Sequence, residues 1–99
     1  MSNAVLLEMS KTQSKRKSKR GTWRVILHDD LVNTFEHVID CLVDICGHNQ
    51  FQAHQCALIT HNRKRCAIYR DNWAGCETVR RLLHSEGLTV SIEKYEETK

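Results

Sequence analysis

The sequence predicts a two-layer α+β domain of element order β-α-α-β-α-β, in which a three-stranded antiparallel sheet packs on helices. Three short runs have the apolar, β-branched or alternating pattern of strands, and three longer segments place apolar residues at helical spacing behind a capping residue. The 99 residues have room for one hydrophobic core. Three strands bury one face only when helices cover it, so two layers are expected.

The first strand is expected at residues 23–28. Its apolar run Trp23-Arg24-Val25-Ile26-Leu27 follows Gly21 and is stopped early by Asp29 and Asp30. A run this short suits a strand better than a helix.

The first helix is expected to begin at Asn33. Asn33 is a good N-cap, and Glu36 lies three residues further on, where its side chain can return a hydrogen bond to the cap. The apolar residues that follow have the spacing of one buried helix face: Phe35, Val38, Ile39, Leu42, Val43 and Cys46. Gly47 is placed to end the helix in a left-handed conformation.

The second helix and second strand follow after a tight turn. Asn49 and Gln52 repeat the capping pattern and open a helix that extends to about Thr60. The polar stretch 61–64 then separates this helix from a strand expected at residues 65–69.

The third helix and last strand complete the domain. Asp71 or Asn72 can cap a helix that Gly87 closes. Residues 88–93 alternate strictly, which is typical of a half-buried strand whose apolar side is Leu88, Val90 and Ile92.

The charge of +3 divides unevenly along the chain. Residues 1–22 carry six basic side chains and one acidic side chain, a net +5, whereas residues 23–99 carry nine basic and eleven acidic side chains, a net −2. We interpret residues 1–22 as a disordered basic arm and residues 23–99 as the folded domain. Such an arm can bind nucleic acid, but no aromatic stacking platform accompanies it, so a solubilising tail is the alternative that we favour.

Other classes of protein find little support. No apolar run is long enough to cross a membrane or to form a signal peptide, so we expect a cytoplasmic protein with reduced cysteines. The pairs Cys46-x-His48 and His54-x-Cys56 lack the tight cysteine spacing of zinc knuckles, and the five cysteines fit core packing better. No metal and no cofactor are expected. No nucleophile, phosphate-loop or metalloprotease motif is present, so an enzyme is the least supported class.

One group of polar residues remains. Asp29 and Asp30 lie between the first strand and the first helix, and His61 lies at the end of the second helix. Taken alone, these residues fit turn formation and helix-dipole pairing. If they converge beside apolar residues, however, two carboxylates and an imidazole would suit the capture of a primary ammonium group.

Three segments resemble the bacterial ClpS adaptor family. The stretch 25–39 is similar to the family's strand, its Asn-Asp-Asp loop and the start of its first helix; the stretch 52–61 resembles the second helix with its closing His, and 87–93 resembles the last strand. The resemblance covers about residues 23–95. It implies an adaptor, not an enzyme, that binds N-degron substrates, which begin with a bulky hydrophobic residue, and delivers them to a Clp ATPase-protease.

The resemblance also implies a binding site. The α-amino group would be held by Asp29 in place of Asn, Asp30 in place of the first Asp, and His61, while Leu31 replaces the second Asp. The side-chain pocket would be lined by Asn33, Phe35, Val38, Ala57, Thr60 and Leu88. Ala57 and Thr60 predict a wider and more polar pocket than that of many members.

The implied partners are the N-terminal domain of the Clp ATPase, which would dock on the second strand and third helix, and N-degron substrates. We expect a monomer that contacts neither membrane nor nucleic acid. The alternatives are a divergent module that keeps the Clp-docking surface and binds another ligand, or nucleic-acid binding through the arm.

Overall fold

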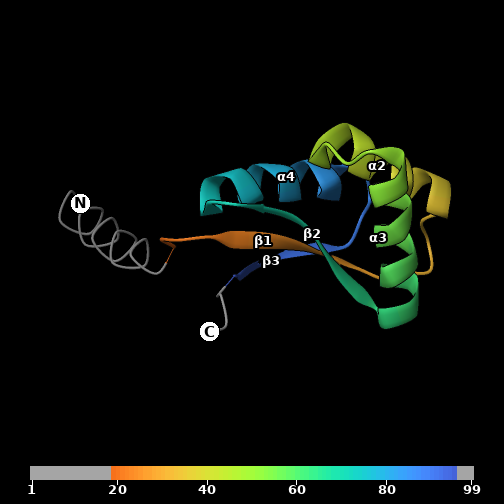
Figure 1. The fold of residues 1–99 in the computed structure, drawn as a ribbon, viewed down its shortest axis with the longest axis horizontal. Helices are drawn as coiled ribbons and strands as arrows, with labels where there is room; N and C mark the ends of the chain where they lie inside the picture. The colour runs from red at the N-terminus through yellow and green to blue at the C-terminus, as the bar shows by residue number, and fades with distance from the viewer. Residues whose placement is uncertain (1–18, 96–99) are drawn as a thin grey trace, which may run out of the picture.

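The computed structural model describes residues 19–95 (Figure 1). The elements are β1 (Trp23–His28), α2 (Phe35–Cys46), α3 (Gln50–Arg63), β2 (Arg65–Asp71), α4 (Trp73–Ser85) and β3 (Val90–Lys94). The predicted α+β class, the order β-α-α-β-α-β and the three-stranded antiparallel sheet are confirmed.

The sheet has the strand order β2-β1-β3, with β1 antiparallel to both neighbours. A bulge between Val25 and Ile26 inserts one extra residue of β2, Ile68, into the ladder. Glu93 on β3 links all three strands. Its carboxylate accepts hydrogen bonds from Arg24 on β1 at 2.9 Å and from Arg65 on β2 at 2.6 Å. The hydrogen bonds from Arg65 and then Arg24 lower the pKa of Glu93 below its usual value.

The helices cover the sheet in two groups. α4 lies along the sheet and contacts all three strands, whereas α2 and α3 pack against each other at one end (Figure 1). α3 also contacts β2, and α2 contacts α4. The end of β1, the start of α2 and the end of α3 therefore meet at one corner of the molecule.

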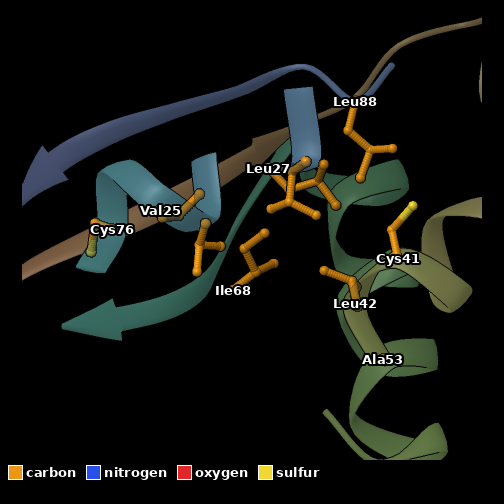
Figure 2. Packing of buried hydrophobic residues seen from close by; sticks show 10 residues of the cluster. Val25, Leu27, Cys41, Leu42, Ala53, Ile68, Cys76 and Leu88 are labelled. Atoms are coloured by element: carbon orange, nitrogen blue, oxygen red, sulfur yellow. The ribbon is translucent and has the colours of Figure 1, made fainter. Parts of the chain in front are cut away.

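Side chains from the sheet and the helices converge to form the core (Figure 2). Val25 and Leu27 alternate on β1 and point to the same side, as a strand with one buried face requires. The buried members of this cluster are Val25, Leu27, Cys41, Leu42, Ala53, Ile68, Cys76, Val79, Leu83 and Leu88. All five cysteines are free thiols, two of them buried and three half-buried.

Two helix boundaries differ from the sequence-based prediction. Thr34, not Asn33, caps α2 by accepting a hydrogen bond from the His37 N–H, because the Asn33 side chain is already bonded to Asp30 and Gly87. α3 continues three residues beyond Thr60, because its last turn is exposed and polar, so the apolar pattern ends before the helix does. Lys64 then closes α3 in the left-handed region with φ of 77°.

The described part of the predicted arm contacts the domain. The Lys19 carbonyl accepts a hydrogen bond from the Trp23 indole, and the Lys19 ammonium lies 3.9 Å from the centre of the Trp73 ring. The rest of the predicted arm, residues 1–18, lies outside the described residues. Among the described helices, none has the length and apolar character to cross a membrane.

Candidate functional site

A pocket of about 260 Å³ opens at the corner where β1, α2 and α3 meet. It is lined by Leu27, His28, Asp29, Asp30, Leu31, Asn33, Phe35, Val38, Ala57, Thr60 and His61. Its volume is near the lower end of the roughly 300–1,000 Å³ of small-molecule pockets. The pocket therefore suits one side chain with its adjoining polar group better than an extended ligand.

Eight of the nine site residues expected from the sequence line this one pocket, and Leu88 is the exception. Leu88 precedes β3 and is only 2% exposed, and it packs in the core cluster with Leu27 (Figure 2). Its place in an alternating run predicted a half-buried position. Leu88 therefore belongs to the core in this structure, and its contact with a ligand stays a prediction.

A main-chain hydrogen bond ties the end of β1 to the end of α3. The Asp29 N–H donates to the Lys64 carbonyl oxygen at 3.0 Å. His61 lies within the last turn of α3, and its ring contacts Phe35 at the start of α2 edge-on, with ring centres 5.5 Å apart. The acidic corner and the imidazole, 31 residues or more apart in the chain, are thereby brought to the same opening.

Asp30 organises the loop between β1 and α2. Its carboxylate accepts hydrogen bonds from the Val32 N–H at 3.0 Å, the Asn33 N–H at 2.9 Å and the Asn33 side-chain amide at 2.9 Å. Partial burial acts to raise the pKa of Asp30, but the hydrogen bonds from Asn33, Val32 and Thr89 together lower the pKa below its ordinary value. Asp30 is therefore a fixed negative charge at neutral pH.

Asn33 connects this loop to the turn between α4 and β3. Its side-chain amide donates both to Asp30 and, at 2.9 Å, to the Gly87 carbonyl oxygen. Gly87 has φ of 89°, which only glycine adopts readily. Asn33 consequently holds two sides of the pocket rim together, a structural role besides lining the pocket.

Asp29 carries the second negative charge at the opening. Its carboxylate lies 3.5 Å from the Lys64 ammonium, whose side chain is 76% exposed. An ion pair this exposed contributes about 0–1 kcal/mol. A ligand ammonium group can therefore displace Lys64 from Asp29 at little cost.

The apolar part of the pocket lining comes from the two facing helices. Val38 on α2 is half-buried, and Ala57 and Thr60 on α3 are buried. The Thr60 hydroxyl donates to the Cys56 carbonyl oxygen at 2.8 Å within its own helix, so this donor is already used. The small Ala57 side chain leaves space between the helices.

Three lining residues were not predicted as site residues. Leu27 and His28 are the last residues of β1, and Leu31 is fully exposed at the rim. Leu27 was assigned to the core by its apolar pattern, and it does serve the core as well as the pocket wall. His28 could have been predicted from its position next to Asp29, because the last side chains of a strand that ends at a pocket also line that pocket.

Taken together, the pocket is lined by two carboxylates, an imidazole and apolar side chains from two helices. Paired carboxylates are hydrogen-bond acceptors and attract a cation, and apolar walls favour burial of a hydrocarbon or aromatic group. The arrangement suits a ligand that carries a primary ammonium next to a hydrophobic group.

Comparison with known proteins identifies a family and solved structures of similar fold. The sequence profile of the family described as "ATP-dependent Clp protease adaptor protein ClpS" matches residues 18–91. The fold is similar to that of Agrobacterium tumefaciens ClpS2, solved bound to L-phenylalaninamide, with a TM-score of 0.70 and 16% sequence identity over 75% of this chain and 96% of that chain. No match was found among curated proteins.

Proposed function

This chain belongs to the ClpS family of ATP-dependent Clp protease adaptor proteins, and we propose that it binds substrates by a bulky hydrophobic N-terminal residue and delivers them to a Clp ATPase-protease. The observation that supports the proposal is a single pocket whose lining includes Asp29, Asp30 and His61 together with apolar side chains. Every protein chain with a free N-terminus offers an ammonium group next to its first side chain.

The bound ligand of the structural neighbour supports this proposal. L-Phenylalaninamide, to which the Agrobacterium tumefaciens ClpS2 is bound, carries a free α-amine beside an aromatic side chain and an amide in place of the following peptide bond. In this chain the α-ammonium would lie between the Asp29 and Asp30 carboxylates and His61. The first side chain would enter between Val38, Ala57 and the neighbouring helix.

The expected affinity is moderate. A charge-assisted hydrogen bond contributes about 1.5–3 kcal/mol, and burial of a large apolar side chain contributes a similar amount. After the cost of ordering the peptide, a dissociation constant in the micromolar range, about −8 kcal/mol, is expected. Leu31 stands where the family has a second Asp, so this site has one carboxylate fewer at that position, while Asp29 adds a charge where the family has Asn.

A scan of the N-terminal residue tests the proposal. Labelled peptides that differ only in their first residue are titrated in fluorescence anisotropy, and those beginning with Phe, Leu, Trp or Tyr should bind at least about tenfold more tightly than those beginning with Ser or Glu. Equal affinity for all first residues would contradict recognition of an N-degron and would favour the divergent module that binds another ligand.

Binding should weaken as the pH rises above the pKa of the peptide's own α-amine. An α-amino group has a pKa of about 7.7–8.0, so only about a tenth of the peptide keeps its ammonium at pH 9. Asp30 stays ionised over this range, because hydrogen bonds lower its pKa below the ordinary value of an aspartate. We therefore expect about tenfold weaker apparent affinity at pH 9 than at pH 7. An N-acetylated peptide serves as the control, and a flat profile for the free-amine peptide would speak against ammonium capture.

Delivery requires a second surface that is separate from the pocket. We propose that this surface docks the N-terminal domain of a Clp ATPase in the cytoplasm, with the adaptor acting as a monomer. The variant His61→Ala should still be retained by the immobilised ATPase domain, but it should carry at least about tenfold less Phe-initial peptide. Loss of both activities in a folded His61→Ala protein would show that capture and docking are not separate.

A further inference from the structure

A second cluster of chemically reactive side chains lies outside the pocket, between α2 and the turn after α4. His37 and Cys41 are one helical turn apart on α2, and Glu86 ends α4. One potential metal-ligand atom from each of these residues lies within 4.8 Å of the others. In residues 19–95 this is the one such set found, and it includes neither of the Cys-x-His and His-x-Cys pairs considered from the sequence.

The distances within this cluster suit a zinc ion. Zn–S bonds of about 2.3 Å and Zn–N bonds of about 2.05 Å, at a tetrahedral angle, place the sulfur and nitrogen atoms about 3.6 Å apart. The Cys41 Sγ and the His37 Nε2 are 3.6 Å apart. Two ligands at positions i and i+4 of a helix form a ready chelating pair, because they share one face of a rigid element.

Burial and charge at the cluster also favour a cation. Cys41 is buried, with its sulfur pointing up from α2 toward the side on which Leu88 lies (Figure 2), while His37 is half-buried and Glu86 is exposed. The cluster is therefore buried on the Cys41 side and open to solvent on the Glu86 side. Asp40 and Asp44 add two further carboxylates near the Cys41 thiol, besides Glu86, so the charge around the cluster is negative.

A simple structural role explains only part of this arrangement. The His37 Nε2 lies 2.8 Å from the Glu86 carbonyl oxygen, and this hydrogen bond accounts for the orientation of the ring. It does not account for a buried thiol against the same nitrogen or for the carboxylate beside both. Because the carbonyl oxygen accepts, Nε2 carries the ring proton here; zinc would bind Nε2 in place of this hydrogen bond, with the ring proton on Nδ1.

We infer that His37, Cys41 and Glu86 form a zinc-binding site that fastens α2 to the turn between α4 and β3. Thiolate, imidazole and carboxylate are the ligands that Zn²⁺ takes, and three protein ligands with one open position are a common arrangement. Glu86 precedes Gly87, whose carbonyl oxygen holds Asn33 at the pocket rim. Zinc at this site would brace the side of the rim that Asn33 joins.

Titration of Zn²⁺ into the full-length, reduced protein tests the site without reference to peptide binding. The wild-type chain should bind one Zn²⁺, and His37→Gln and Glu86→Gln should each weaken binding more than about tenfold. The matched controls His54→Gln and Glu36→Gln, which change an exposed histidine and an exposed glutamate on α3 and α2, should bind zinc as the wild type does. Absence of saturable binding, or equal binding by the His37 and Glu86 variants, would overturn the inference.

Cobalt provides a direct readout of the thiolate. Co²⁺ bound through Cys41 should give a thiolate-to-metal charge-transfer band in the near ultraviolet, which Cys46→Ser should keep and Cys41→Ser should lose. A band that persists in Cys41→Ser would place the metal on another cysteine and would contradict the site. Because Cys41 is buried and its replacement can disturb folding, the His37 and Glu86 variants carry the test if Cys41→Ser does not fold.

Discussion

Replacing Asp30 by asparagine is expected to weaken binding of a Phe-initial peptide about 10- to 100-fold. The substitution keeps one acceptor oxygen for the Val32 and Asn33 N–H groups but removes the charge that would face the ligand ammonium. Loss of one charge-assisted hydrogen bond costs about 1.5–3 kcal/mol, which corresponds to an affinity about 10- to 100-fold weaker. Fluorescence anisotropy of a labelled peptide measures the effect.

A matched substitution separates the site from the overall charge. Asp44→Asn removes the same charge from an exposed position of α2 and should leave the affinity within about twofold, since exposed charges at a distance are screened by salt. Circular dichroism and thermal melting establish that Asp30→Asn is folded, because Asp30 also accepts the Asn33 side-chain amide. Undiminished affinity of a folded Asp30→Asn protein would remove Asp30 from the proposed recognition.

Truncation of Leu42 is expected to have the largest effect on stability. Leu42 is 0% exposed on α2, in the core cluster shared by the sheet and the helices. Removing a buried leucine side chain leaves a cavity and costs about 2–5 kcal/mol, a large part of the total stability of a small domain. Urea unfolding of Leu42→Ala, followed by circular dichroism, measures this loss.

Leu82 offers the same substitution outside the core. Its side chain on α4 is 49% exposed, so Leu82→Ala should cost less than about 1 kcal/mol. The comparison keeps the chemical change constant and varies only burial. If the two variants unfolded at the same urea concentration, the packing described for α2 against the sheet would be wrong.

The fold follows from patterns that are local in the sequence. The apolar stripe of α2, the alternation near β3 and the capping box of Asn49 and Gln52 each depend on a few neighbouring residues, and each is present in the structure. Helix ends were less predictable. Asn33 is an equally good cap by its chemistry, but its hydrogen bonds with Asp30 and with Gly87, 54 residues away, leave the capping role to Thr34.

The site depends on contacts that sequence patterns do not contain. Asp29 and His61 are both polar residues at the ends of elements, and only the hydrogen bond from Asp29 to Lys64 and the edge-on contact of Phe35 with His61 place them at one opening. Family resemblance, not periodicity, pointed to this convergence. The resemblance also placed Leu88 in the pocket; in the structure Leu88 is 2% exposed and packs in the core cluster, so its contact with a ligand stays a prediction.

The proposed metal ligands could not be predicted from the sequence for a similar reason. His37 and Cys41 are four residues apart on an otherwise apolar helix, where a cysteine is ordinarily a small core residue. Glu86 lies 45 residues beyond Cys41, and the two residues come near each other only because α4 packs against α2. Short Cys and His motifs do not reveal a site whose ligands come from two distant elements.

Acetylation of the peptide N-terminus tests the central proposal most directly. Two otherwise identical Phe-initial peptides, one with a free α-amine and one N-acetylated, are titrated at pH 7 against the full-length protein in fluorescence anisotropy. The pocket described above predicts micromolar affinity for the free amine and at least about tenfold weaker binding of the acetylated peptide, because acetylation removes the charge that Asp29 and Asp30 would face. Equal affinity for both peptides would contradict the proposal that this corner binds protein N-termini.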